Sequence, residues 1–425
     1  MDGQIRLLDK SIQPKKIHAA SLKINKELIS KNVLKIIEKL NASGFQAYLV
    51  GGCIRDLMLG MHPKDFDLTT DAKPQEIRRL FKNCRLIGRR FRLAHIRFGR
   101  ELIEVATFRS SAENNQADIL RSSRGRILRD NAYGSIEDDV FRRDFRCNAL
   151  YYDTVSNYIL DYVGGLKDIK SKRLVMIGNA HRRLHEDPVR MIRAIRFAAK
   201  LNFNIDTQLA SSIKKNSGLL ESIPAARIFD EFLKLFQSGY AESTFELLVK
   251  FGLFKELFPQ TDEQINSDAT LKGFIVAALQ NTDLRFIEKK PITPMFLLGV
   301  FLWGPILKYS SNIKKRKKCS QSRSLVISTY KVIAMNSNRM AIPKRFSSLM
   351  SEMIAMQPRF EIISSKQAKL LSRLRIFRAA YDFLLLRSLV GDCSEEVIKF
   401  WSKVQLKTGK DIHHRKVNRK QLNGR

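Results

Sequence analysis

Strand-forming segments occur in this chain only before about residue 165, and this restriction limits the folds that it can adopt. Short apolar and β-branched runs, separated by glycine turns, mark that part. Beyond about residue 185 the apolar residues recur at helical spacing almost throughout. Strands and helices that are segregated along a sequence indicate an α+β protein. The sequence therefore predicts a small mixed-sheet head followed by an all-α remainder.

The pattern of apolar runs and turns also predicts the individual elements. Strands are expected at 46–50, 65–69, 85–88, 93–98, 102–108 and 158–163. Helices are expected after Ser30, at 54–59, at 74–81 and from a capping box at Ser135 to about residue 150. Residues 110–130 are expected to form a mobile loop. The predicted segments are a flexible N-terminal segment 1–27, a head 28–165, a helical neck 166–240, a helical body 241–401 and a basic tail 402–425.

The chain carries a large positive charge, with 76 Lys and Arg against 42 Asp and Glu, or +34 over 425 residues. An excess of this size indicates a polyanionic partner, either a nucleic acid or an acidic membrane surface. Residues 294–307 are uncharged but too few to span a bilayer, so they predict a buried helix and no membrane anchor. The five cysteines are too scattered for a zinc or redox pair and indicate reduced thiols in the cytoplasm.

Two carboxylates flank one apolar residue in the segment Asp65-Phe66-Asp67. In a strand, alternate side chains share a face, and the Cα atoms of Asp65 and Asp67 would lie roughly 7 Å apart. Both carboxylates could then bind one or two Mg²⁺ ions, which prefer oxygen ligands. Taken alone, such a pair is more often solvated at a sheet edge.

The turn Gly51-Gly52 precedes this pair and leads into an expected helix. Glycine lets backbone amides approach an anion closely, and a helix N-terminus favours negative charge. Carboxylates that hold metal ions beside a phosphate site are what phosphoryl or nucleotidyl transfer requires. The sequence therefore predicts this chemistry for the head.

Glu104 interrupts an otherwise apolar strand. An unpaired carboxylate is costly to bury. Glu104 therefore either faces the metal site as a third acidic group or faces solvent, and the residues around it favour neither alternative.

Three charged residues, Arg142-Arg143-Asp144, follow the capping box. The arginines could neutralise a triphosphate or an RNA backbone, and Asp144 could hold a ribose hydroxyl or a metal ion. A helix that continued to about residue 150 would place Asp144 and Asn148 on one face. The alternative is an ordinary charged helix face.

A helix with an acidic start is expected at Glu186-Asp187-Pro188. Asp187 and Arg190 together offer an acceptor and planar donors to the edge of a base. The alternative is an intrahelical ion pair, which contributes only about 0.2–0.5 kcal/mol.

The order of these motifs resembles that of the class II tRNA nucleotidyltransferase and poly(A) polymerase family. The shared pattern comprises Gly51-Gly52-x-x-Arg55-Asp56, Asp65-x-Asp67, Glu104 to Arg109, Arg142-Arg143-Asp144 and Glu186-Asp187-x-x-Arg190. The resemblance implies a head of the polymerase-β nucleotidyltransferase type. It also implies that the helical neck recognises the nucleotide base and that the helical body binds RNA.

The same resemblance assigns roles to single residues. It implies that Asp65 and Asp67 bind the catalytic Mg²⁺ and that Asp144 is a further catalytic aspartate, with Glu104 as the candidate for a third carboxylate. The residues implied to bind the nucleotide are Gly51, Gly52, Arg55, Arg109, Arg142, Arg143, Asp187 and Arg190.

One segment, Leu86-Ile87-Gly88-Arg89-Arg90-Phe91-Arg92-Leu93-Ala94-His95, resembles the signature of the bacterial poly(A) polymerase branch. The resemblance implies a monomeric cytoplasmic enzyme that transfers AMP from ATP to RNA 3′ ends, with Arg89, Arg90 and His95 near the base-selecting residues. The alternatives are CCA addition to tRNA and a catalytically silent RNA-binding relative.

Overall fold

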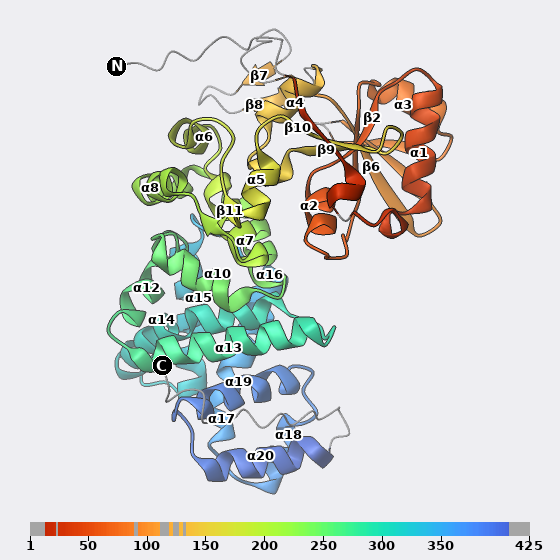
Figure 1. Cartoon of the computed structure of the whole chain (residues 1–425). Coiled ribbons are helices and arrows are strands. Elements are labelled where there is room, and N and C mark those ends of the chain that lie inside the picture. The colour runs from red at the N-terminus through yellow and green to blue at the C-terminus, as the bar shows by residue number, and fades with distance from the viewer. Residues whose placement is uncertain are drawn as a thin grey trace. The chain divides into compact units, whose positions relative to one another are not determined.

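The computed structural model describes residues 13–22, 24–88, 92–110, 119–121, 127–130 and 133–407 (Figure 1). The chain forms two compact units. The head unit extends to Glu186 and includes Leu201–Ser212, and the helical unit comprises Asp187–Lys200 and the chain from Ile213 onward. The head unit thus takes in part of the segment that the sequence assigns to a neck.

An eight-stranded sheet forms the centre of the head unit, in the order β1-β10-β9-β2-β3-β6-β5-β4. β3 and β6 are parallel and the other neighbours are antiparallel, so the predicted mixed sheet is confirmed. The strands are β1 Lys15–His18, β2 Ala47–Val50, β3 Asp67–Thr70, β4 Cys84–Ile87, β5 Leu93–Phe98, β6 Glu101–Thr107, β9 Leu150–Asp153 and β10 Tyr158–Asp161.

Helices cover the sheet unevenly. α1 (Lys31–Ala42) and α3 (Pro74–Leu80) lie together on one side, and α2 (Gly52–Met58) follows β2 directly (Figure 1). α4 (Ile136–Arg142) packs through Ile136 and Val140 into a buried cluster with Val50 and Tyr151 of the sheet. Farther along the sheet, β6 buries Ile103 and Val105 but exposes Glu104 between them. The face that carries Glu104 is therefore open at this end of the sheet.

The N-terminal part of the chain corrects one prediction. β1 pairs with β10, and two 3-10 helices follow at Ala19–Leu22 and Lys26–Leu28. The expectation of a flexible segment was therefore wrong for residues 15–22 and 26–27. Alternating apolar residues are not needed here because β1 lies at the sheet edge and gains its backbone hydrogen bonds from β10.

The end of α4 corrects a second prediction. The capping box of Ser135 and Asp138 is confirmed, but α4 ends at Arg142, where Arg143 takes an extended conformation. A 3-10 turn at Arg146–Asn148 follows, and then the strand β9. Asp144 and Asn148 are therefore not one turn apart on a helix. The aromatic pair Tyr151-Tyr152 favours a strand, and it is buried in the sheet.

The expected loop at 110–130 contains two short paired strands, β7 (Ile119–Arg121) and β8 (Ile127–Asp130), so it is not wholly a loop. Most of its other residues lie outside the described part of the chain, as do Arg89 and Arg90. Farther on, the head unit contains α5 (Gly165–Lys170), α6 (Ala180–Glu186) and a parallel strand pair, β11 (Arg173–Leu174) with β12 (Asn204–Ile205). β12 is a strand beyond residue 185, where none was expected.

The helical unit has an aromatic core. The ring of Phe301 lies 4.9 Å from that of Phe236 and 5.0 Å from that of Phe258, measured between centroids. Two helices link the units in sequence, α7 Val189–Leu201 and α8 Thr207–Asn216. The others are α9 Ala225–Phe236, α10 Ala241–Lys250, α11 Phe254–Leu257, α12 Pro259–Ile265, α13 Ala269–Ile287, α14 Pro294–Lys317, α15 Gln321–Asn336, α16 Lys344–Ala355, α17 Gln357–Phe360, α18 Ser365–Leu371, α19 Phe377–Leu389 and α20 Glu395–Lys407.

Two predictions for the helical unit are decided by these helices. The uncharged stretch 294–307 forms the buried first half of α14, as expected. Within the described residues, no helix has the length and apolar character needed to cross a membrane. The basic tail was predicted to begin at residue 402, which is too early, because α20 continues to Lys407. α20 buries Trp401, whose indole nitrogen donates to Phe360 O at 2.7 Å.

Candidate active site

A row of polar residues crosses three neighbouring strands of the head. Asp67, the first residue of β3, lies opposite Glu104 of β6, and Glu104 lies opposite His95 of β5. Residues that are directly opposite in a sheet point to the same face. The row continues through Val50 and Tyr151 in the other direction, where α4 covers it. The open half of this face therefore gathers Asp67, Glu104 and His95.

The two aspartates of the motif are placed differently from the prediction. The strand begins at Asp67, so Asp65 precedes it by two residues, and both side chains are exposed. The pKa of Asp67 is raised, first because the surrounding protein partly shields the carboxylate from water, and then by the charges of Glu104 and Asp65. Arg143 opposes this rise. Three carboxylates and one guanidinium therefore act on each other at this end of the sheet.

Glu104 combines the two alternatives that the sequence left open. Its side chain is 48% exposed, and one oxygen lies 3.3 Å from Nε2 of His95. It also shares a register position with Asp67 and raises the pKa of that carboxyl. Glu104 thus faces solvent and the acidic cluster at once.

The glycine turn lies against the arginine motif. Gly51 has φ +84°, a left-handed conformation that favours glycine, and its amide donates to Leu150 O at 3.2 Å. A Cβ atom built on Gly51 would lie 3.6 Å from Nη1 of Arg143. Arg143 therefore lies against the turn that leads into α2, and the anion site expected there stays a prediction.

Arg55 lies beneath this turn. Its side chain is only 2% exposed, and its Nε donates to Asp56 at 2.9 Å while Nη1 donates to Asn148. A Cβ atom on Gly52 would lie 3.3 Å from Nη2 of Arg55. These contacts tie α2 to the 3-10 turn at Arg146–Asn148. The contact between Arg55 and a nucleotide stays a prediction.

A buried carboxylate organises the two arginines of Arg142-Arg143-Asp144. Asp139 is fully buried and accepts from Nε of Arg142 at 2.9 Å, from Nη2 of Arg143 at 2.9 Å and from the hydroxyl of Tyr151 at 2.6 Å. Burial alone would raise the pKa of Asp139, but the charges of Arg143 and Arg142 and the hydrogen bond from Tyr151 lower it below its usual range. The backbone amide of Arg109 also donates to Asp139, at 3.4 Å.

Sequence reasoning missed Asp139 and Tyr151. A local signal for Asp139 was present, because it lies three and four residues before Arg142 and Arg143, the spacing at which charged side chains meet on a helix. Tyr151 had no such signal, since its contact with Asp139 depends on how α4 packs against the sheet.

Asp144 lies in the bend after α4 and is half-buried. Its carbonyl accepts from the amide of Ile177 at 3.0 Å. Arg183 of α6 donates to the two preceding carbonyls, those of Arg142 and Arg143. The backbone on both sides of Arg143 is therefore held by the segment 177–183.

Asp187 and Arg190 belong to the helical unit. The two oxygens of Asp187 accept from the two terminal nitrogens of Arg227, at 3.0 and 2.8 Å, and Oδ1 also accepts from the amide of Val189 at 3.3 Å. The amide of Arg190 donates to the carbonyl of Asp187 at 3.0 Å. Arg227 was missed because it lies 40 residues away in the sequence.

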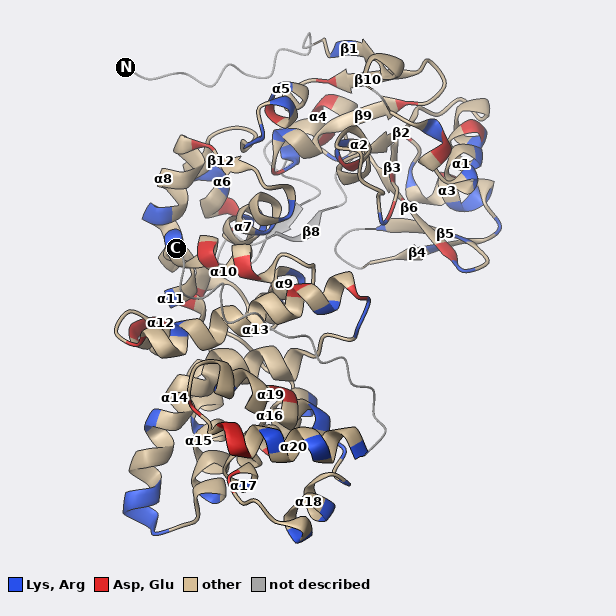
Figure 2. Cartoon of the chain, turned by 60° about the horizontal axis from the view of Figure 1, so that its bottom comes forward, with Lys and Arg blue, Asp and Glu red and all other residues tan. Residues whose placement is uncertain are grey.

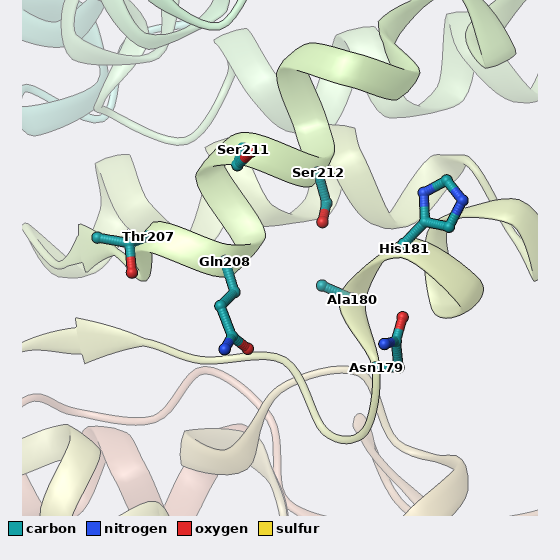
Figure 3. A pocket seen from close by; sticks show the side chains of 7 residues that line it. All are labelled: Asn179, Ala180, His181, Thr207, Gln208, Ser211 and Ser212. Carbon is teal, nitrogen blue, oxygen red and sulfur yellow. The ribbon is translucent and has the colours of Figure 1, made fainter. Parts of the chain in front are cut away.

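A cavity of about 470 Å³ lies elsewhere in the head unit, between the start of α6 and the first turns of α8 (Figure 3). Asn179, His181, Gln208 and Ser211 are among the residues that line it. None of the residues that line it is a carboxylate or one of the predicted site residues.

This chain is similar to known proteins in sequence and in fold. Three family models match: one described as "Poly A polymerase head domain" at residues 47–175, one as "Probable RNA and SrmB- binding site of polymerase A" at 202–265, and one as "Polymerase A arginine-rich C-terminus" at 317–424. Poly(A) polymerase I of Escherichia coli O6:H1 is 42% identical over 408 residues, which cover 94% of this chain and 87% of the relative.

Two CCA-adding enzymes are more distant. That of Lactobacillus johnsonii is 31% identical over 259 residues, which cover 58% of this chain and 63% of the relative. The solved structure of the Thermotoga maritima CCA-adding enzyme complexed with tRNA has a TM-score of 0.63 and 18% identity, and covers 96% of this chain and 90% of that one. The similarity to the solved Thermotoga maritima structure establishes the nucleotidyltransferase fold. The identity to poly(A) polymerase I over nearly the whole chain establishes the poly(A) polymerase branch. This chain belongs to the bacterial poly(A) polymerase family of nucleotidyltransferases.

Proposed function

We propose that this chain is a template-independent polynucleotide adenylyltransferase, which transfers AMP from ATP to RNA 3′ ends and releases pyrophosphate. The observation that carries the proposal is the row of Asp67 and Glu104 on an open sheet face, beside the turn at Gly51 and the guanidinium of Arg143. Acidic groups for a metal ion and a cationic turn for phosphates occur together there. Nucleotidyl transfer needs this combination.

Mg²⁺ is the metal ion that this site would use. Asp65 and Asp67 offer carboxylate oxygens. The pKa of Asp67 is raised first by partial burial and then by the charges of Glu104 and Asp65, and a bound cation would offset both effects. The described residues contain no group of three or more His, Cys, Asp and Glu that could hold a metal ion. Two carboxylates suit Mg²⁺, which keeps water and substrate phosphates as its other ligands. When bound, it would lower the pKa of the RNA 3′-hydroxyl and stabilise the leaving pyrophosphate.

The arginines around the turn would hold the triphosphate. Transfer forms a bond between the RNA 3′ oxygen and the α-phosphorus, and it breaks the bond from that phosphorus to pyrophosphate. Negative charge develops on the phosphate oxygens, where Arg142 and Arg143, fixed in advance by Asp139, would stabilise it. Gly51, Gly52 and Arg109 complete the proposed nucleotide site, with Arg55 holding the turn from beneath.

Asp144 is the proposed further catalytic aspartate. Its backbone is fixed by Ile177, and it follows directly after Arg143. A carboxylate at this position can accept a hydrogen bond from the ribose hydroxyl of the nucleotide or take part in metal binding. Glu104, opposite Asp67, is the proposed third carboxylate.

Asp187 and Arg190 would select the base. An Asp accepts and an Arg donates hydrogen bonds, so together they can match the edge of adenine. Arg227 holds both oxygens of Asp187 and would set the orientation of that carboxylate. Arg227 is thus added to the predicted site.

RNA would be held mainly through its phosphates. The net charge of +34 far exceeds what one nucleotide requires, and Figure 2 shows Lys and Arg gathered in the last turns of α14, where Lys314 to Lys317 follow each other. Contacts of this kind release counterions from the RNA. We expect affinity for RNA to fall steeply between 50 and 200 mM salt, by about 300-fold if six phosphates of a single strand are neutralised. We further propose that the protein is a cytoplasmic monomer. Light scattering in solution measures its mass and therefore tests the monomeric state.

The test is incubation with RNA, Mg²⁺ and each labelled nucleotide separately, for the wild type and for Asp67→Ala. We expect the wild type to incorporate ATP into an oligoadenylate and the variant to bind this RNA without extending it. Extension by Asp67→Ala at the wild-type rate would overturn the site. If the wild type binds the RNA but incorporates none of the nucleotides, the chain is a catalytically silent relative.

CCA addition is the nearest alternative. The identity of 42% to a poly(A) polymerase over 94% of the chain supports adenylate addition, because the CCA-adding relative matches only 58%. Efficient incorporation of CTP into a tRNA that lacks its CCA end would favour the alternative.

A further inference from the structure

Arg183 contacts the arginine motif from a different helix. Its Nη2 donates to the carbonyl of Arg142 at 2.7 Å and to the carbonyl of Arg143 at 2.8 Å. Its Nη1 donates to Glu186 at 2.9 Å, one turn farther along α6. The guanidinium thus spans the end of α4 and is itself held by a carboxylate.

The two carbonyls need an outside donor. The last carbonyls of a helix have no partner within the helix. α4 ends at Arg142, and Arg143 leaves it with φ −67° and ψ 162°, so the chain turns away at once. A cation at this end also interacts favourably with the helix dipole. Arg183 supplies both the donors and the charge, from 40 residues farther along the chain.

The residues that Arg183 fixes are those placed in the proposed site. The side chain of Arg143 faces Gly51, and Asp144 is the next residue. The amide of Ile177 holds the carbonyl of Asp144 at 3.0 Å, so the bend is tied on both sides to one short segment. Asp139 fixes the guanidinium of Arg143, and Arg183 fixes its backbone.

We propose that Arg183 is a positioning residue of the nucleotidyl transfer, which acts through Arg143 and Asp144 without touching the substrate. The proposal rests on the proposed function of the head. Misplacement of a group that stabilises the transition state by about 1 Å can lower the rate about 10²-fold. A cap that served stability alone would leave the folded protein fully active.

The test compares Arg183→Ala and Arg183→Lys with the wild type in single-nucleotide extension of an RNA primer, at a temperature where thermal unfolding shows all three folded. We expect Arg183→Ala to lower kcat about 10- to 100-fold, with the RNA affinity unchanged. Lys, which can donate to both carbonyls but does not reproduce the planar fork, should restore part of kcat.

Free guanidinium ion gives a readout that a loss of stability would not move. The side chain of Arg183 is 15% exposed, so the space left by Arg183→Ala is reachable from solvent. We expect millimolar guanidinium chloride to raise kcat of this variant several-fold, against sodium chloride at equal ionic strength. Rescue requires the ion to bridge the same two carbonyls.

Arg182→Ala is the matched control. Arg182 is the preceding residue of α6, is 45% exposed and pairs with the same Glu186 at 3.4 Å. It should keep kcat within about twofold and show no rescue, because exposed ion pairs contribute little. Wild-type kcat in Arg183→Ala, or a loss of kcat that guanidinium does not reverse and Lys does not restore, would overturn the proposal. A wild type without AMP transfer would instead overturn the proposed function.

Discussion

Arg143 donates two hydrogen bonds to the fully buried carboxylate of Asp139, from Nε at 3.1 Å and from Nη2 at 2.9 Å. This pair lies between the α4 cluster and the open sheet face, so the guanidinium belongs to the protein interior and to the proposed site at once. The charge of Arg143 is therefore fixed before a nucleotide arrives. A preorganised cation of this kind loses little free energy to reorganisation in the reaction.

Asp139→Asn tests this arrangement. The substitution keeps the shape but leaves Arg142 and Arg143 without their buried counter-charge, which we expect to destabilise the head unit by about 3–5 kcal/mol. Tyr151→Phe removes the hydrogen bond to the same carboxylate and the one that the hydroxyl accepts from Nε of Arg143 at 3.0 Å, but no charge, and we expect a loss of about 2 kcal/mol. Urea unfolding followed by circular dichroism measures both. Equal losses for the two variants would contradict the importance of the charge.

The difference in stability between the wild type and Asp139→Asn should depend on pH in a definite direction. The pKa of Asp139 is lower in the folded protein than the value of about 3.9 for a free Asp. A group with a lowered pKa stabilises the folded state above its unfolded pKa and loses this contribution as the pH falls toward the folded value. The gap between wild type and Asp139→Asn should stay constant from pH 8 to about 5 and shrink only in stronger acid. A stability gap that narrows between pH 7 and 6 would contradict the lowered pKa of Asp139.

Asp67→Asn should separate stability from function. Partial burial and the charges of Glu104 and Asp65 disfavour the ionised Asp67. Its removal should therefore stabilise the folded protein in the absence of Mg²⁺ by less than about 1 kcal/mol, because the side chain is exposed, and should raise Tm slightly. AMP transfer should be lost. Because a ligand of the folded state stabilises it by mass action, MgCl₂ should raise Tm of the wild type more than that of the variant. Differential scanning calorimetry with and without MgCl₂ decides this, and Glu101→Gln at the start of β6 is the control.

The residues that the sequence identified are those with a local signal. Asp65 and Asp67 are separated by one residue, Gly51 and Gly52 are adjacent, and the capping box at Ser135 has fixed spacing. Each of these patterns has a physical meaning that does not depend on the rest of the fold. The mixed sheet followed by helices was predictable for the same reason, since strand and helix periodicities are local.

The residues that the sequence missed act through tertiary contacts. Tyr151 reaches Asp139 only because β9 lies under α4, and Arg227 reaches Asp187 from another helix. The end of α4 at Arg142 was missed because a good capping box fixes where a helix starts and says nothing about where it stops. Arg183 supplies the partner for that end from α6.

Glu104→Gln tests whether Glu104 takes part in metal binding as the proposed third carboxylate. If Glu104 shares in metal binding, loss of its charge should raise the Mg²⁺ concentration for half-maximal activity and lower kcat about tenfold, a change of about 1.4 kcal/mol. Glu101→Gln, three residues earlier on β6, should leave both values unchanged, because Glu101 only accepts a hydrogen bond from Asn32 at 2.6 Å. Steady-state extension over a Mg²⁺ titration measures this. Indistinguishable titrations for the two variants would assign Glu104 to solvent.

Arg227→Ala tests how the base is selected. Asp187 is held by two hydrogen bonds from Arg227, so the orientation in which it accepts from a base depends on that guanidinium. Without it the carboxylate can turn, and we expect the preference for ATP over GTP or CTP in kcat/KM to fall about tenfold, while transfer itself continues. Single-nucleotide extension with each nucleotide gives the ratio.

Arg339→Ala is the matched control for this change. Arg339 forms a comparable ion pair with Glu221 in the same helical unit, at 3.1 Å, and belongs to no predicted motif. It should keep the ATP preference within about twofold, since a surface ion pair contributes little. An unchanged preference in Arg227→Ala would show that Asp187 either needs no support or takes no part in reading the base. If the preference does fall in Arg227→Ala, Arg227→Lys separates geometry from charge, because a single ammonium charge cannot reproduce the bidentate geometry: relaxed selection in the Lys variant as well would assign the effect to the orientation of Asp187 and not to charge.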